Sequence, residues 1–107
     1  MDTQANTEFD WNNSYLVKFS ITYKVDFGQS LAVTGDIPEL GQWGTNMNSI
    51  VRLTWTHGDV WKLTEPRKLK NHKFSYKYIV VRDNEIERWE SCENREIYLD
   101  NMLNIFA

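Results

Sequence analysis

The residues whose chemistry stands out in this sequence are aromatic. Five Trp, five Tyr and five Phe make up 14% of the 107 residues. Trp is bulky, and its N–H needs a hydrogen-bond partner when the ring is buried, so one small core does not easily hide five of them. Some of these rings are therefore expected to be exposed, and a cluster of exposed rings indicates a binding surface.

Acid–base, nucleophilic and metal chemistry have weaker support. Four candidate carboxylates for a hydrolase, Glu85, Glu87, Glu90 and Glu93, crowd one short strand and turn, so we interpret them as solvated charges rather than a catalytic pair. Cys92 lies between Glu90 and Glu93, which is a poor setting for a thiolate nucleophile. A single cysteine forms neither an internal disulfide nor a zinc site, and we expect no metal and no cofactor.

Length and charge exclude several classes of protein. A chain of 107 residues corresponds to one domain. Its 12 basic and 15 acidic residues give a net charge of −3, which argues against a nucleic-acid binder or an anionic-membrane binder. No stretch approaches the roughly 18 apolar residues of a membrane span. Residues 1–13 are polar and contain no apolar signal segment, so a cytoplasmic location is expected.

Alternation of apolar and polar residues predicts strands along most of the chain. The clearest case places Tyr15, Val17, Phe19, Ile21 and Tyr23 on one face of a strand. Strands are expected over residues 15–24, 30–34, 49–55, 60 to at most 66, 74–81, 86–90, 95–99 and 102–106. About six to eight strands with frequent turns, no helical period and no repeat predict an all-β sandwich or barrel.

The other segments are predicted to be an arm, a loop and turns. Residues 1–13, which include Trp11, are interpreted as a flexible N-terminal arm. Residues 35–44 contain three Gly and one Pro, which favours a loop with at most one helical turn. The basic stretch 67–73 is interpreted as a solvated connection rather than a phosphate site. His57 and His72 are expected to be surface residues.

Strand alternation also predicts which tryptophans are exposed. In a regular strand Ile86 faces the core and Trp89 faces solvent, although a bulge would reverse this assignment. Trp61 is expected in the core, and Trp55 in the core or at a sheet end. Trp43 lies in the glycine-rich loop, where its ring either stands out as a platform or tucks into the edge of the core.

Five segments follow one another in a recognisable order. They are Phe-Gly-Gln-Ser-Leu-Ala-Val over residues 27–33, Gly-Asp-Ile-Pro-Glu-Leu-Gly-Gln-Trp over 35–43, Val-Trp at 60–61, Phe-Ser-Tyr-Lys-Tyr-Ile over 74–79 and Trp-Glu-Ser-Cys-Glu-Asn-Arg over 89–95. In their order and spacing, residues 15–105 resemble the starch-binding domain family, carbohydrate-binding module family 20. The resemblance implies an antiparallel, immunoglobulin-like β-sandwich of about seven to eight strands.

The resemblance also implies where sugars bind. In the first site two platform rings flank polar groups that bond the hydroxyls, and the matching residues are Trp43, Lys77, Trp89, Glu90 and Asn94. The sequence departs from the family at the second site, where Phe27 replaces a common Tyr and Trp55 is the other candidate ring. We therefore expect the second carbohydrate site to be weakened or absent.

The resemblance implies a binding function without catalysis. The expected ligand is an α-glucan such as starch, glycogen or a maltooligosaccharide. Binding would target an attached or partner enzyme, for example a C-terminal catalytic domain, to the polysaccharide. The alternative is an immunoglobulin-like protein–protein interaction module that uses its exposed aromatic residues as the contact surface.

Overall fold

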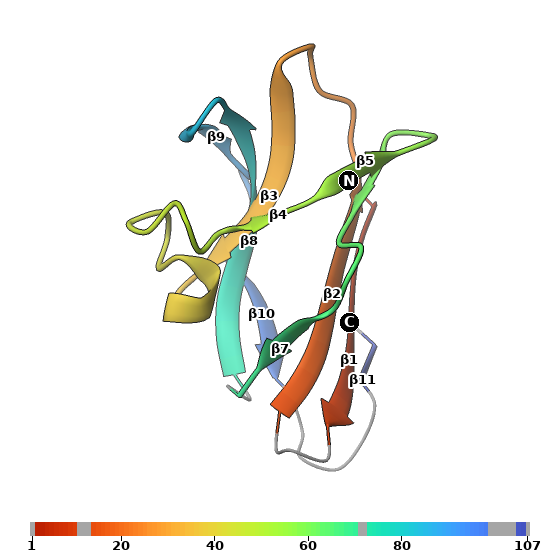
Figure 1. Cartoon of the computed structure of the whole chain (residues 1–107), viewed down its shortest axis with the longest axis vertical. Helices are drawn as coiled ribbons and strands as arrows, with labels where there is room; N and C mark the ends of the chain where they lie inside the picture. The colour runs from red at the N-terminus through yellow and green to blue at the C-terminus, as the bar shows by residue number, and fades with distance from the viewer. Residues whose placement is uncertain (1, 11–13, 71–72, 99–104, 107) are drawn as a thin grey trace.

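The computed structural model describes residues 2–10, 14–70, 73–98 and 105–106. These residues form two antiparallel sheets that face each other, which confirms the predicted all-β sandwich (Figure 1). The strand order is β11-β1-β2-β6-β5 in the first sheet, where β7 also pairs with β2, and β10-β8-β3-β4 in the second, where β9 also pairs with β8. Within the described residues, no helix is long and apolar enough to cross a membrane.

The elements have the following bounds. The first sheet contains β1 (Asp2–Asp10), β2 (Ser14–Thr22), β5 (Thr54–Thr56), β6 (Val60–Lys62), β7 (Arg67–Leu69) and β11 (Ile105–Phe106). The second sheet contains β3 (Gln29–Gly35), β4 (Val51–Arg52), β8 (Lys73–Arg82), β9 (Glu85–Trp89) and β10 (Arg95–Tyr98). A short 3-10 helix, η1 (Pro38–Leu40), follows β3.

The core lies between the sheets and is built by alternation along β2 and β8. The predicted inward positions of β2, from Tyr15 to Ile21, are all buried. The facing residues of β8 are Phe74, Tyr76, Tyr78 and Val80, and all belong to the same core cluster. Trp61 joins this core as predicted, and its indole N–H donates to the Tyr23 carbonyl at 3.1 Å.

The segment predicted as a flexible arm is different in the structure, because residues 2–10 form strand β1. Their backbone pairs with β2 without interruption, from Asp2 opposite Thr22 to Asp10 opposite Ser14. The physical reason is that β2 has a second edge whose N–H and C=O groups need partners, and a polar segment supplies them as well as an apolar one. Trp11 lies outside the described residues.

The basic stretch 67–73 also contains structure that the sequence did not indicate. Its first three residues are strand β7, and Leu69 lies opposite Tyr15 with only 1% of its surface exposed. Three residues are too few for a period to be recognised, so the charges of the neighbouring residues hid this apolar anchor. His72 lies outside the described residues, and His57 is exposed in the turn between β5 and β6.

The predicted strand over residues 49–55 crosses from one sheet to the other. Its first part, β4, pairs with β3, and its second part, β5, pairs with β6. Between them the Leu53 N–H donates to the Leu31 carbonyl at 3.0 Å. Because β5 is an edge strand, Trp55 is 51% exposed, which is the sheet-end alternative of the prediction.

Candidate functional site

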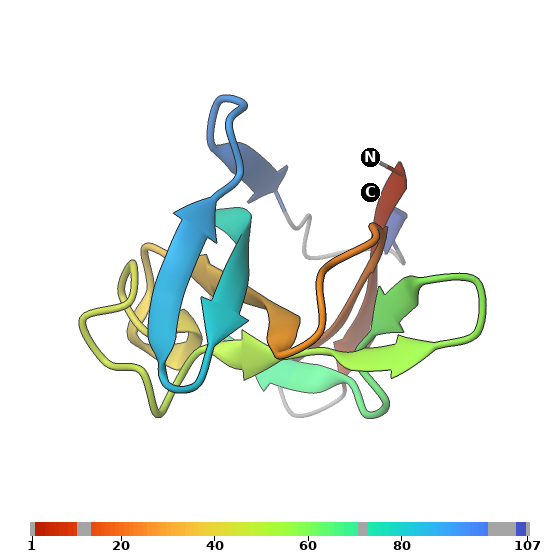
Figure 2. The same cartoon turned by 90° about the horizontal axis from the view of Figure 1, so that it is seen from above.

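The loop between β3 and β4 and strand β9 lie on the side of the molecule away from the first sheet (Figure 1, Figure 2). Four consecutive residues of this loop have positive φ, namely Gly41 (82°), Gln42 (45°), Trp43 (58°) and Gly44 (85°). This conformation is uncommon for a bulky residue such as Trp, and backbone strain of this kind clusters at functional sites. The Trp43 N–H donates to the Gly35 carbonyl at 2.8 Å, which ties the loop to the end of β3.

A β-bulge in strand β9 determines which way Trp89 points. Trp89 lies opposite Ile79 and Ile86 lies opposite Val81, so Glu87 is the extra residue in the ladder. The bulge places Trp89 and Ile86 on the same outer face, whereas a regular strand would have separated them. The exposure predicted for Trp89 is confirmed, at 42%, but the assignment of Ile86 to the sandwich core is wrong.

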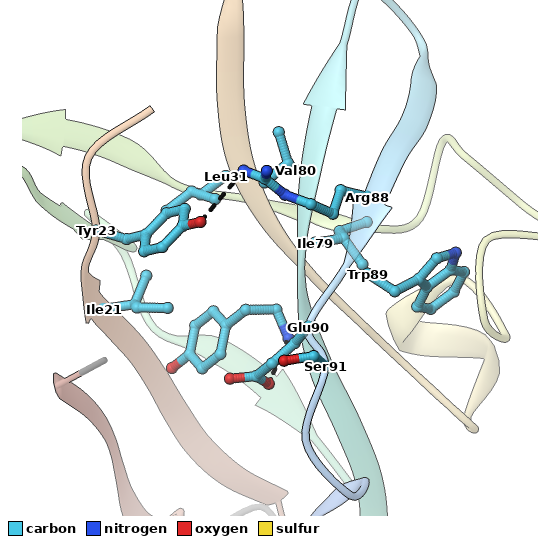
Figure 3. A pocket seen from close by; sticks show the side chains of 10 residues that line it. Ile21, Tyr23, Leu31, Ile79, Val80, Arg88, Trp89, Glu90 and Ser91 are labelled. Carbon is cyan, nitrogen blue, oxygen red and sulfur yellow. Dashed lines mark hydrogen bonds between the residues drawn. The ribbon is translucent and has the colours of Figure 1, made fainter. Parts of the chain in front are cut away.

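The inner side of the same strand borders the space between the sheets. Figure 3 shows Trp89 pointing away from a pocket of about 130 Å³ that Ile21 and Tyr23 line from the opposite sheet. Arg88 also lines this pocket, and its guanidinium donates to the Tyr23 hydroxyl at 3.2 Å. The pocket therefore lies on the inner side of β9. Trp89 also borders it, but the indole ring points the other way.

Trp43 of the β3–β4 loop and Trp89 of β9 come together on the outer surface. The ring centroids of Trp43 and Trp89 are 6.3 Å apart, and their planes are tilted by 53°. A small apolar layer supports the surface beneath them, consisting of Ala32, Met47, Ile50, Ile79, Val81 and Ile86. Gly44 packs closely on this layer, because a Cβ at that position would lie 2.5 Å from the Ile86 Cδ1 atom.

Lys77 contributes a positively charged group to the same side of the sheet. It lies on β8 two residues before Ile79, and its Nζ donates to the Glu90 carbonyl at 3.0 Å and to the Cys92 carbonyl. An ammonium group has three N–H donors, so one remains for a ligand hydroxyl. Asn94 is exposed in the loop that joins β9 to β10.

Glu90 lies on the inner side, where its carboxylate is held by Arg95. Arg95 Nε lies 3.0 and 3.1 Å from the two carboxylate oxygens, and its terminal Nη2 lies 2.7 Å from Oε2. Burial acts to raise the pKa of the Glu90 carboxyl, but the hydrogen bonds and charge of Arg95 outweigh it, and the pKa is lowered. Sequence reasoning missed the role of Arg95. Strand alternation placed Glu90 on the same side as Ile86, but the resemblance grouped Glu90 with the sugar ligands, so no cation was sought for its carboxylate.

This ion pair predicts a pH dependence of stability. Because folding lowers the pKa of Glu90, its contribution to the free energy of unfolding is complete above the ordinary value of 4.5. The contribution is lost as the pH falls through the lowered value. Urea unfolding at pH 6 and pH 3 should show the wild-type advantage over Glu90→Gln shrinking in acid. Glu93→Gln, in the exposed part of the same loop, is the control, and a pH-independent advantage would contradict the prediction.

The candidates for a second site lie on other elements. Phe27 is fully exposed in the turn between β2 and β3, and Trp55 is on edge strand β5. The Trp55 indole N–H donates to the Asp59 carboxylate at 3.0 Å. The structure therefore shows two accessible rings there, one of which already uses its polar atom within the protein.

Comparison with known families agrees with this geometry. The family model described as "Starch binding domain" matches residues 14–104. The chain belongs to the starch-binding domain family. The match covers every residue of the predicted first site, including the loop with Trp43, the β8 strand with Lys77 and the segment from Trp89 to Asn94. No individual curated protein sequence matches this starch-binding domain.

Two solved structures are similar to this starch-binding domain. A Glycoside Hydrolase Family 15 glucoamylase from Hypocrea jecorina aligns with a TM-score of 0.64 and 26% identity, over 77% of this chain and 14% of that one. Gamma-CGTase from alkalophilic Bacillus clarkii aligns with a TM-score of 0.58 and 21% identity, over 71% of this chain and 12% of that one, and supports the fold alone. The domain thus spans a small part of each of these proteins.

Proposed function

We propose that this domain binds α-glucan chains, without changing them chemically, by stacking glucose residues on Trp43 and Trp89. The observation that carries the proposal is the pair of indoles, 6.3 Å apart and tilted by 53° on one surface. Each face of a glucose ring presents C–H groups that match an indole in size and polarity. An α-1,4 chain is curved, so tilted rings suit its successive residues better than a coplanar row would.

The rim of each glucose carries hydroxyls that need directed partners. The remaining donor of Lys77 and the amide of Asn94, which both donates and accepts, supply such partners. The site is open to water and engages few atoms, so we expect a dissociation constant of about 10 μM to 1 mM for a short chain. A polymer offers many overlapping positions, and its retention exceeds that of one short chain.

Two carboxylates near the tryptophan pair, Glu87 and Glu90, support binding without catalysis. A glycosidase needs a carboxylic acid with a raised pKa, close to a second carboxylate. Hydrogen bonds from Arg82 and Gln29 lower the pKa of Glu87. The pKa of Glu90 is lowered as well, so both acids are ionised acceptors. We expect the domain to release no reducing sugar from starch.

Intrinsic tryptophan fluorescence tests the proposal directly. Titration with maltoheptaose or β-cyclodextrin should give a saturable change, and cellohexaose, a straight β-1,4 chain of similar composition, is the matched control. An equal response to cellohexaose would reject the α-glucan specificity. The absence of a response at millimolar maltoheptaose would reject sugar binding and favour the protein–protein interaction module.

The second site should contribute much less than the first. Phe27 lacks a hydroxyl, and the polar atom of Trp55 is already bonded to Asp59. We expect the double variant Phe27→Ala/Trp55→Ala to lower retention on granular starch by no more than about threefold, with maltoheptaose affinity unchanged. A loss of retention equal to that of a first-site variant would show a fully working second site.

We further propose that the domain holds an attached or partner enzyme on the polysaccharide, in the cytoplasm. The glucoamylase supports this, because the domain aligns with only 14% of that longer chain. Fractionation of cells and capture on insoluble starch and on glycogen test the proposal. An enzyme activity that is retained with the domain on either polymer would support it, and retention of the domain alone would reject it.

A further inference from the structure

The loop between β9 and β10 begins and ends with the two members of one ion pair. Glu90 is the first residue after β9, Arg95 is the first residue of β10, and the closest approach between the guanidinium and the carboxylate is 2.7 Å. The Glu90 side chain is only 4% exposed and that of Arg95 is 28% exposed. Bidentate pairs of this kind are strong and directional, because the planar guanidinium fixes both partners in one orientation.

The ion pair lies on the opposite side of the sheet from the tryptophan rings. The Glu90 N–H donates to the Tyr78 carbonyl at 3.1 Å, and the Arg95 guanidinium lies over the Tyr78 ring, 5.6 Å from its centroid. Tyr78 faces the sandwich core, and Figure 3 shows the Glu90 side chain on that side of the strand while Trp89 points the other way. A glucan stacked on Trp89 therefore does not reach the carboxylate.

The loop is also tied on its outer side. Lys77, which precedes the inward-facing Tyr78, donates from Nζ to the carbonyls of Glu90 and Cys92. The backbone on the C-terminal side of Trp89 is thus held between a lysine on one face of the sheet and an arginine–glutamate pair on the other. In contrast, the loop side chains from Ser91 to Asn94 are exposed. The loop owes its fixed path to these ties rather than to burial.

We infer that Arg95 is a positioning residue of the glucan site, which fixes the backbone from Trp89 to Asn94 by clamping Glu90 from the inner face. The inference rests on the proposed function and deepens it. Arg95 acts through Glu90, whose carboxylate does not contact the sugar. An arginine is needed at position 95 because its guanidinium presents two N–H donors side by side to the two carboxylate oxygens. The single ammonium nitrogen of a lysine cannot form this planar fork.

A double-mutant cycle tests this role. Calorimetric titration with maltoheptaose, well below the melting temperature, compares wild type with Arg95→Met, Glu90→Gln, the double variant and Arg95→Lys. Arg82→Met is the matched control, because Arg82 forms the exposed 2.9 Å pair with Glu87 on the same hairpin. We expect Arg95→Met to bind about tenfold more weakly, Arg95→Lys to lie between it and wild type, and Arg82→Met to bind normally.

Two further observations distinguish positioning from a general loss of stability or from direct contact. The double variant should bind no more weakly than the weaker single variant, and the indole N–H NMR signal of Trp89 should move in Arg95→Met without ligand. Wild-type affinity in Arg95→Met would overturn the inference. So would a loss of affinity in the double variant equal to the product of the losses in the two single variants. If Arg95→Met does not fold, wild-type affinity in Arg95→Lys would overturn the inference instead. Failure of the wild type to bind maltoheptaose would instead overturn the proposed function, and the inference with it.

Discussion

Replacing Trp89 by alanine should weaken the binding of maltoheptaose by roughly 30-fold or more while leaving the fold intact. The ring is 42% exposed on the outer face, so its loss leaves the inner core unchanged. A central aromatic contact is worth about 2 kcal/mol or more, which is roughly 30-fold in affinity. Starting from a dissociation constant of about 10 μM to 1 mM, this loss moves half-saturation to about 0.3 mM to 30 mM. Trp43→Ala should have the same effect on affinity.

The control for this prediction is another exposed aromatic residue on the same sheet. Tyr98 on β10 is 58% exposed and lies outside the proposed site, so Tyr98→Ala should bind as wild type does. Calorimetry gives the affinities, and circular dichroism verifies that all three variants are folded. Near-normal binding by Trp43→Ala and Trp89→Ala would mean that the tilted pair is not the sugar platform. Equal losses in all three variants would indicate a non-specific effect.

The sequence predicted those features that depend on local alternation. The inward series of β2 and the buried position of Trp61 follow from a period of two over many residues, and both are confirmed. The loop that carries Trp43 was predicted from its glycines, three of which lie within residues 35–44. The residues of the site could be named from the order of the family segments. Alternation and segment order thus named the residues of the candidate site, and the structure brings Trp43 and Trp89 together.

The features that were not predicted depend on non-local pairing. The bulge at Glu87 reverses the side on which Ile86 lies, and nothing in the five residues of β9 distinguishes a bulged strand from a regular one. The pairing of residues 2–10 depends on an open edge of β2, which exists only once the sheet has formed. A regular strand through an inward-facing Ile86 already places Glu90 on the inner side. The resemblance nevertheless grouped Glu90 with the sugar ligands, and its pairing with Arg95 is a contact that alternation alone does not predict.

A second large effect is expected from Gly35→Ala, at the end of β3. A Cβ at position 35 would lie 2.4 Å from the Ser75 carbonyl oxygen and 2.8 Å from the Leu40 Cδ1 atom. The first of these is a backbone atom in the adjacent strand and cannot rotate away. Relief of the clash therefore requires β3 and β8 to separate where Asp36 exchanges hydrogen bonds with Ser75. Overpacking of this kind costs about 1–3 kcal/mol of unfolding free energy.

The same substitution should also weaken glucan binding, because the Gly35 carbonyl accepts the hydrogen bond that fixes Trp43. Urea unfolding and maltoheptaose titration measure the two effects on one protein sample. Gly58→Ala is the matched control, since Gly58 has a φ of +84° but no atom within 4 Å of the added Cβ. It should lose only about 1–2 kcal/mol through backbone strain and keep its affinity. If Gly35→Ala matched the wild type in stability and affinity, the close approach of β3 to β8 would not be what holds the Trp43 loop in place.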